Sequence, residues 1–235
     1  MSRQTHITAW RSTGISDAAD GHVQDMPADL TGDRPRALAT KLALELLTHI
    51  PPEMREATGV FLGMPYGSLA ADLAFQRSRR ADGGQFASPA AFARTLPSTL
   101  AAQVALAGGL CGPGVVVCAG SASGAVAVAR ASQWICSGAM ESCLAGVLHC
   151  GPLDDAAAPA AFFCLLTAAP PGAAGLKLTA RVEIPTAPPS GVITTAAENL
   201  AAIAALADMM TAAEKTPQTL TATAQGIAVR LCVSR

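Results

Sequence analysis

The stretch VVVCAGSASGAVAVARA, residues 115–131, decides how the rest of the sequence is interpreted. It opens with three valines, passes through a turn of small residues, and continues into an alanine-rich segment of helical composition. A strand that ends in a tight turn leading into a helix is where many enzymes place a nucleophile. The candidate nucleophiles in this turn are Cys118, Ser121 and Ser123.

The composition restricts the classes of function. The chain has 235 residues, of which 51% are hydrophobic, so it can bury a sizeable core. Charged residues make up 14%, aromatic residues 4%, and the formal net charge is −1, which argues against a nucleic-acid partner. No uninterrupted apolar run reaches the roughly 18 residues of a membrane span, and the N-terminus lacks a secretory signal. We therefore expect a cytoplasmic protein without a membrane span.

Cysteine and histidine follow no metal-binding pattern. The seven cysteines include no CxxC pair, and the four histidines, His6, His22, His49 and His149, are scattered singly. The turn at residues 118–123 holds no Lys or Arg and no GxGxxG motif, so nucleotide binding is not indicated. We expect reduced cysteines, no metal and no cofactor.

The periodicity of the remaining segments predicts an α/β fold with a sheet of mixed direction and helices on both faces. The expected strands lie at 6–10, 58–64, 115–118, 142–149, 160–168, 176–184, 219–224 and 227–233. The expected helices lie at 34–50, 69–80, 97–107, 122–136 and 195–214. Thr195 and Glu198 would form a capping box, and Gln225-Gly226 a hairpin turn. We expect a domain over residues 1–190, which the C-terminal helix and hairpin at 191–235 complete.

Three stretches resemble the N-terminal half of the β-ketoacyl synthases, which are condensing enzymes of the thiolase-like fold. They read GVFLGMPYGSLAADLAF (59–75), FASPAAFARTLPSTLAAQVALAGGLCGPG (86–114) and VVVCAGSASGAVAVARASQWICSGAMESCLAGVLH (115–149). They are similar to the family's strand and Gly-Ser helix, its Ser-Pro…Leu-Pro helix with a Gly-Pro turn, and its nucleophile turn with the flanking elements. Their order and spacing make the resemblance specific, and it implies a thiolase-like fold.

By this resemblance the nucleophile position falls on Gly120. The family's condensing enzymes carry Thr-Ala-Cys-Ser-Ser-Ser where residues 118–123 read Cys-Ala-Gly-Ser-Ala-Ser. Glycine has no side chain that could form a thioester. We expect Cys118, two residues earlier, to be buried and Ser121 to cap the helix. The family's second half supplies two histidines and a lysine, and this sequence ends at Arg235, about where that half would begin.

The resemblance therefore implies a non-catalytic subunit of the chain-length-factor type. Such a subunit pairs with an active β-ketoacyl-ACP synthase as a heterodimer and shapes its acyl tunnel, as in aryl-polyene-type, polyketide and fatty-acid-like biosynthesis. Phe92, Arg94, Thr95 and Leu96 would reach across the interface toward the partner's acyl pocket. The strand at 142–149, or a neighbouring strand, would pair with the partner's sheet.

Three alternatives remain open at this stage. The chain could be a small acyltransferase or hydrolase that uses Ser121 or Cys118. Residues 92–96 could be an ordinary loop with one core phenylalanine. Arg79-Arg80 could contact an acidic acyl carrier protein, or could simply be the solvated end of a helix.

Overall fold

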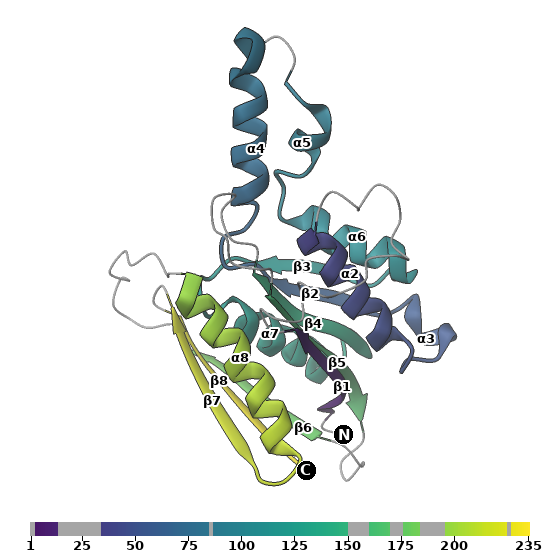
Figure 1. Ribbon diagram of the computed structural model, residues 1–235. Helices are drawn as coiled ribbons and strands as arrows, with labels where there is room; N and C mark the ends of the chain where they lie inside the picture. Colours follow the sequence, from purple (N-terminus) through teal and green to yellow (C-terminus); the bar gives the residue numbers. More distant parts are fainter. Residues whose placement is uncertain are drawn as a thin grey trace.

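The computed structural model describes residues 3–13, 34–84, 87–149, 160–169, 176–183, 196–224 and 227–235. Its strands form one eight-stranded sheet in the order β3-β2-β4-β5-β1-β6-β8-β7 (Figure 1). They are β1 (Gln4–Thr13), β2 (Gly59–Gly63), β3 (Gly114–Val117), β4 (Ser142–His149), β5 (Ala160–Ala169), β6 (Leu176–Glu183), β7 (Gln218–Ala224) and β8 (Ile227–Ser234). Because β2 pairs in parallel with β3 and β4 while the other pairs are antiparallel, the sheet is mixed, as the sequence predicts.

Helices cover both faces of this sheet. They are α2 (Arg34–Leu47), α3 (Pro52–Arg55), α4 (Leu69–Arg80), α5 (Pro89–Ala93), α6 (Ser98–Gly108), α7 (Ser123–Ser137) and α8 (Ala196–Ala213), with a 3-10 turn, η2, at Ala81–Gly84. One helical layer consists of α2 and α6, which pack against each other. The opposite layer consists of α7, which lies against β2 and β4, together with α8 beside β7.

Side-chain alternation in the central strands divides the apolar core between these two layers. In β5, Phe162 and Cys164 belong to the cluster around α7, whereas Phe163 and Leu165 belong to the cluster around α2 and α6. This is the period of two expected for a strand covered on both faces, and it explains why such strands read as continuous apolar runs.

The N-terminus of α7 lies against the backbone of β2. A Cβ atom added to Gly63 would lie 2.5 Å from the carbonyl carbon of Ser123 and 2.6 Å from the nitrogen of Gly124. A Cβ atom on Gly124 would lie 2.8 Å from Cγ1 of Val147. Glycine at both places therefore permits a close approach that fixes where the helix begins.

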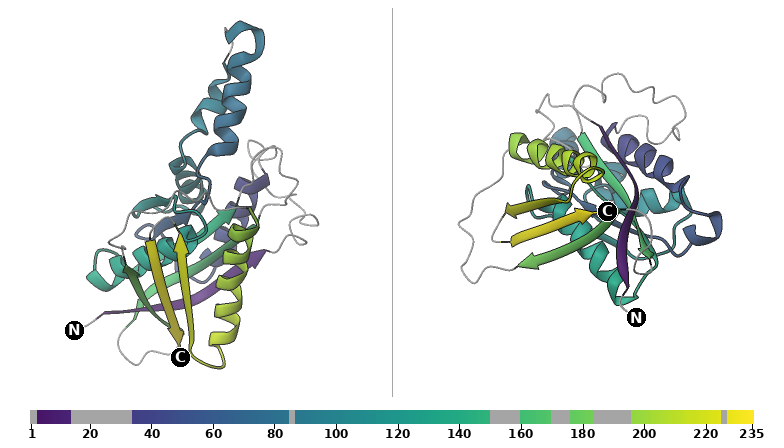
Figure 2. Two further views of the ribbon diagram at one scale, coloured as in Figure 1. Left: turned by 90° about the vertical axis from the view of Figure 1, so that its left-hand side faces the viewer. Right: turned by 90° about the horizontal axis from the view of Figure 1, so that it is seen from below.

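An arm made of α4, η2 and α5 projects from the body of the molecule in two orthogonal views (Figures 1 and 2). Neither α4 nor α5 contains a buried residue. The rings of Phe75 and Phe92 contact each other across the arm, with their centroids 5.2 Å apart. Phe92 in the arm and Leu96 in the segment that follows it are nevertheless more than half exposed in this chain.

Most expected elements are confirmed, with particular corrections. The strand at 142–149 has the predicted bounds, but it is an interior strand, and β3 is the edge strand next to the turn. Residues 11–13, expected as loop, extend β1, while α3 and α5 were not predicted. The capping box at Thr195 and the hairpin turn at Gln225-Gly226 fall outside the described residues. Within the described part of the chain, no helix is both long and apolar enough to span a bilayer.

Candidate functional site

The turn between β3 and α7 is compact, and its backbone enters the left-handed region of conformation at one residue. Gly120 has φ +53° and is buried. Only glycine adopts this conformation without steric cost. The backbone nitrogens of Ala122 and Ser123 donate to the carbonyls of Ala119 and Gly120, at 3.1 and 3.0 Å. Gly120 is thus part of a closed turn, with no side chain to react.

Ser123 holds this turn together. Its hydroxyl donates to the carbonyl of Gly120 at 2.7 Å and accepts from the backbone nitrogen of Ala119 at 2.8 Å. The residue is fully buried. Because its proton and one lone pair are committed inside the turn, this hydroxyl serves a structural role rather than that of a nucleophile.

Ser121 is not the helix cap that the sequence predicts. The N-cap residue of α7 is Ala122, which makes no side-chain cap bond. Ser121 is half-buried and lines a cavity of about 160 Å³ that α8 and β7 close from the other side. Among the described residues lining this cavity, Glu198 is the only ionisable one. A serine here has no histidine among those residues to act as its base.

Cys118 is exposed, so the expectation that it is buried is wrong. It follows β3 directly, and its Sγ would lie 3.4 Å from a Cβ atom built on Gly67. Partial desolvation raises the pKa of the Cys118 thiol above its ordinary value. Since the thiolate is the reactive form, this environment suppresses nucleophilicity near neutral pH.

The segment at residues 92–96 presents two large apolar side chains to solvent. Phe92 is 60% exposed and Leu96 is 61% exposed. Phe92 is therefore not a core residue of the isolated chain, and the interpretation of this segment as a loop around a core phenylalanine is wrong. Arg94 and Thr95 are half-buried, and the Thr95 hydroxyl donates to the carbonyl of Phe92 at 2.8 Å.

Sequence reasoning missed the residues that hold this segment. Arg36 Nη2 donates to the carbonyl of Arg94 at 3.4 Å, and the Ser68 hydroxyl donates to the carbonyl of Thr95. The sequence favours Ser68 as the cap of α4, but it makes no side-chain cap bond there. No local pattern could have identified either contact, because the partners are 58 and 27 residues apart in the chain.

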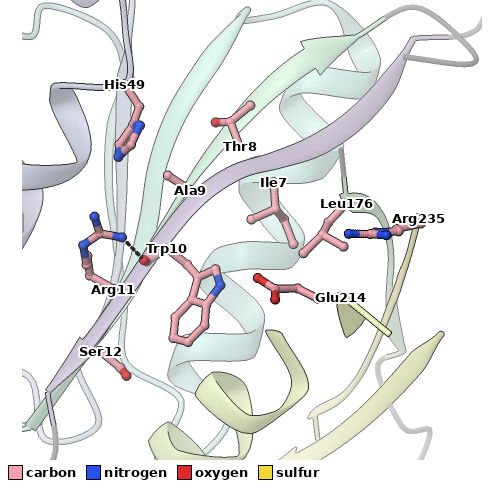
Figure 3. A pocket seen from close by; sticks show the side chains of 10 residues that line it. All are labelled: Ile7, Thr8, Ala9, Trp10, Arg11, Ser12, His49, Leu176, Glu214 and Arg235. Atoms are coloured by element: carbon pink, nitrogen blue, oxygen red, sulfur yellow. Dashed lines mark hydrogen bonds between the residues drawn. The ribbon is translucent and has the colours of Figure 1, made fainter. Parts of the chain in front are cut away.

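An open cleft of about 1130 Å³ lies on both sides of β1, away from the turn (Figure 3). Arg11 and His49 lie on one side of the strand, and Trp10 and Glu214 on the other. Arg11 Nη1 donates to the carbonyl of Trp10 at 2.8 Å. Among the described residues of this cleft, no hydroxyl or thiol is paired with a base, so they do not form a nucleophilic catalytic site.

The described histidines and cysteines do not converge on a metal site. In the described ranges, no group of three His, Cys, Asp or Glu residues is arranged to hold a metal ion. His149 ends β4 and is buried, with its ring 5.6 Å from that of Tyr66. His22 falls outside the described residues.

The fold and the turn define a class of protein. The mixed sheet with α7 buried behind the turn is the thiolase-like arrangement of a ketosynthase, and the sequence profile described as "Beta-ketoacyl synthase, N-terminal domain" matches residues 31–156. That match spans more than half of the chain. The chain therefore belongs to the β-ketoacyl synthase N-terminal domain family. No curated protein matches its sequence.

Solved structures support the same fold along nearly the whole chain. The structure titled "The ishigamide ketosynthase/chain length factor" superposes with a TM-score of 0.74 at 15% identity, covering 98% of this chain and 99% of that one. A ketosynthase (ApeO) in complex with its chain length factor (ApeC), from Xenorhabdus doucetiae, gives 0.65 at 15% identity, with 99% of both chains covered. A complex of AntDE with AntF, titled as a type II PKS acyl-carrier protein in complex with its ketosynthase, gives 0.70 at 13% identity, covering 100% of this chain and 99% of that one.

Proposed function

We propose that this chain is a non-catalytic subunit of the chain-length-factor type. It pairs with an active β-ketoacyl-ACP synthase in the cytoplasm and shapes that enzyme's acyl tunnel during polyene or fatty-acid-like synthesis. Residues 1–190 and 191–235 act as one domain. The observation that carries the proposal is the turn at Gly120, which keeps the closed backbone of a strand–turn–helix site but has a glycine, without a side chain, at its left-handed position.

The edge of the sheet supports a heterodimer. Strand β3 pairs with β2 on one side only, and its valines are half-buried. The helices α6 and α7 flank it and carry Leu106, which is 84% exposed, and Trp134, which is 38% exposed. An edge strand whose backbone pairs on one side, with β-branched side chains that are only half-buried, is a ready template for pairing with another sheet. Burying this edge against a ketosynthase would cover all of these apolar groups together.

The arm supports a second area of contact with the same partner. Two short helices without a buried residue gain little stability from packing against their own chain, and isolated helices of this length are marginal in water. Contact with the partner would cover Phe92 and Leu96, and these side chains would then form part of the wall of its acyl tunnel. Titles of three similar structures name ketosynthases with a chain length factor or a carrier protein, which is in keeping with this assignment.

Co-expression with an active ketosynthase followed by gel filtration tests the pairing. We expect a stable complex that Leu106→Lys abolishes, because a lysine beside β3 would have to be desolvated at the interface. Thr221→Lys on β7, the opposite edge, is the matched control and leaves the complex intact. A stable monomer that ignores the ketosynthase would contradict the proposal, and so would equal loss of complex in both variants.

One observation favours the alternative of a small acyltransferase or hydrolase: Cys118 is exposed. Its raised thiol pKa and the lack of a histidine among the described residues around Ser121 weigh against that function. Intact-protein mass spectrometry after incubation with an acyl donor separates the two proposals. A covalent acyl adduct on Cys118 or Ser121 would establish the enzyme, whereas an unmodified mass supports the non-catalytic subunit.

A further inference from the structure

The segment that carries Leu96 is attached to the body of the molecule through main-chain carbonyls. The carbonyl of Arg94 accepts from Arg36 at 3.4 Å, and the carbonyl of Thr95 accepts from Ser68. These two donors come from the start of α2 and from the residue before α4, which are distant parts of the chain. The attachment leaves the side chains of Phe92 and Leu96 free to point outward, where both are more than half exposed.

The guanidinium of Arg36 also binds the helix that follows the segment. Its Nη2 donates to the Thr99 hydroxyl at 3.0 Å, and its Nη1 donates to Oε1 of Gln103 at 3.2 Å. One planar cation therefore ties the carbonyl of Arg94 to the first turns of α6. The donors of a guanidinium keep fixed relative directions, so the group sets a distance and an orientation that a lysine would not reproduce.

A cavity lies behind the segment, so the hydrogen bonds to its carbonyls matter for its position relative to the body of the molecule. It has a volume of about 70 Å³, and its lining includes Arg36, Ser68, Ala71, Arg94 and Pro97. A space of this size holds a few water molecules and no acyl chain. Because this space is not filled by side chains, packing from behind constrains only in part how far the segment stands out from the body. The hydrogen bonds to its carbonyls supply a further constraint.

We propose that Arg36 and Ser68 are positioning residues that set how far Phe92 and Leu96 project toward the partner subunit. This inference rests on the proposed function, in which those two side chains shape the partner's acyl tunnel. Loosening the attachment lets the segment sink toward the cavity, and the wall that it forms in the tunnel retreats. The complex then makes longer products, although neither positioning residue touches the acyl chain.

The Ser68 contact is the weaker of the two. Its hydroxyl also lies 3.1 Å from Oδ2 of Asp72, and a hydroxyl has only one proton to donate. Asp72 therefore competes with the carbonyl of Thr95 for that proton. We expect Ser68→Ala to have a smaller effect than Arg36→Ala, in the same direction.

The experiment uses the full chain, alone and in complex with its ketosynthase. The variants are Arg36→Ala, Arg36→Lys and Ser68→Ala, and the matched control is Arg130→Ala. Arg130 is exposed and, among the described residues, its Nη1 donates to Oε1 of Gln133 one turn along the same helix. Hydrogen exchange over residues 92–99 reports the attachment in the isolated chain. Product lengths at matched amounts of assembled complex report the tunnel.

We expect Arg36→Ala to speed exchange over residues 92–99 about tenfold, because a hydrogen bond to a charged group is lost. The same variant shifts the products to greater length, Arg36→Lys gives a partial shift, and Arg130→Ala changes neither quantity. If Arg36→Ala does not fold, Ser68→Ala decides the matter, since it removes one hydroxyl from a half-buried site.

Failure of this inference is distinguishable from failure of the proposed function. If Phe92→Ala leaves the product lengths unchanged, the tunnel-shaping function itself is wrong. If Phe92→Ala shifts them while Arg36→Ala and Ser68→Ala do not, the tunnel role stands and the positioning role is overturned. Faster exchange without a change in product length also overturns it.

Discussion

Gly63→Ala tests whether the close approach of β2 to α7 holds the turn in place. The added Cβ would lie 2.5 Å from the carbonyl carbon of Ser123 and 2.6 Å from its oxygen, about 1 Å inside the normal contact distance. These are backbone atoms, so no rotamer change relieves the overlap. The helix must move away from the sheet, and its ten buried residues lose packing. We expect a loss of about 3 kcal/mol in the free energy of unfolding, the upper end for overpacking.

Thermal unfolding followed by circular dichroism measures this effect. For a chain of this length, about 3 kcal/mol lowers the melting temperature by roughly 6–12 °C. Gly114→Ala is the matched control, because a Cβ there has no atom within 4 Å, and its effect stays within about 1 kcal/mol. Equal melting temperatures for the two variants would refute the argument that backbone contact fixes the start of α7.

Three further predictions concern the turn at Gly120, the segment at residues 92–96, and the pH dependence of the stability of the fold. Gly120→Cys does not produce malonyl decarboxylation or condensation by the chain alone, because a cysteine at φ +53° is strained. Turnover by this variant would contradict the non-catalytic assignment. Phe92→Ala lowers the stability of the isolated chain little, since the ring is 60% exposed, but it lengthens the products of the complex. Thr95→Trp shortens the products, and product profiling of the complex checks both variants. Burial, and secondly the charge of Lys177, lowers the pKa of His6. The unfolded state therefore binds more protons than the folded state, and the stability of the fold falls as the pH drops below about 6.5. His6→Leu should make the melting temperature less dependent on pH in this range, and an unchanged pH dependence would assign it to other groups.

The sequence pattern predicted an element well where neighbouring residues determine where it begins and ends. The apolar run at 142–149 between polar and turn residues has the bounds of β4, and the glycines after residue 107 end α6. The arm was harder to predict. Ser88 caps α5, and its hydroxyl oxygen accepts a hydrogen bond from the backbone nitrogen of Ala91, yet the helix is so short that hydrophobic periodicity could not reveal it.

The candidate site residues show the same difference between local and long-range features. Gly120 was singled out through the resemblance to the β-ketoacyl synthases, which was recognisable because the turn is a contiguous segment, and its positive φ is a property of the backbone there. Arg36 and Ser68 were not identified, because their roles depend on carbonyls far away in the chain. Ser123, rather than Ser121, secures the turn because its hydroxyl reaches the carbonyl of Gly120 and the nitrogen of Ala119.

The sequence by itself determined the class of fold and the order of most elements. These depend on periodicity and on short motifs, which are properties of neighbouring residues. Its resemblance to the β-ketoacyl synthases predicts that Gly120 stands at the nucleophile position. Only the tertiary structure decided that β3 is the edge strand and β4 an interior one, that Cys118 is exposed, and that Phe92 and Leu96 face outward. The physical reason is that β3 and β4 are both short apolar runs, and a strand's place in a sheet is set by long-range pairing that its own residues do not encode.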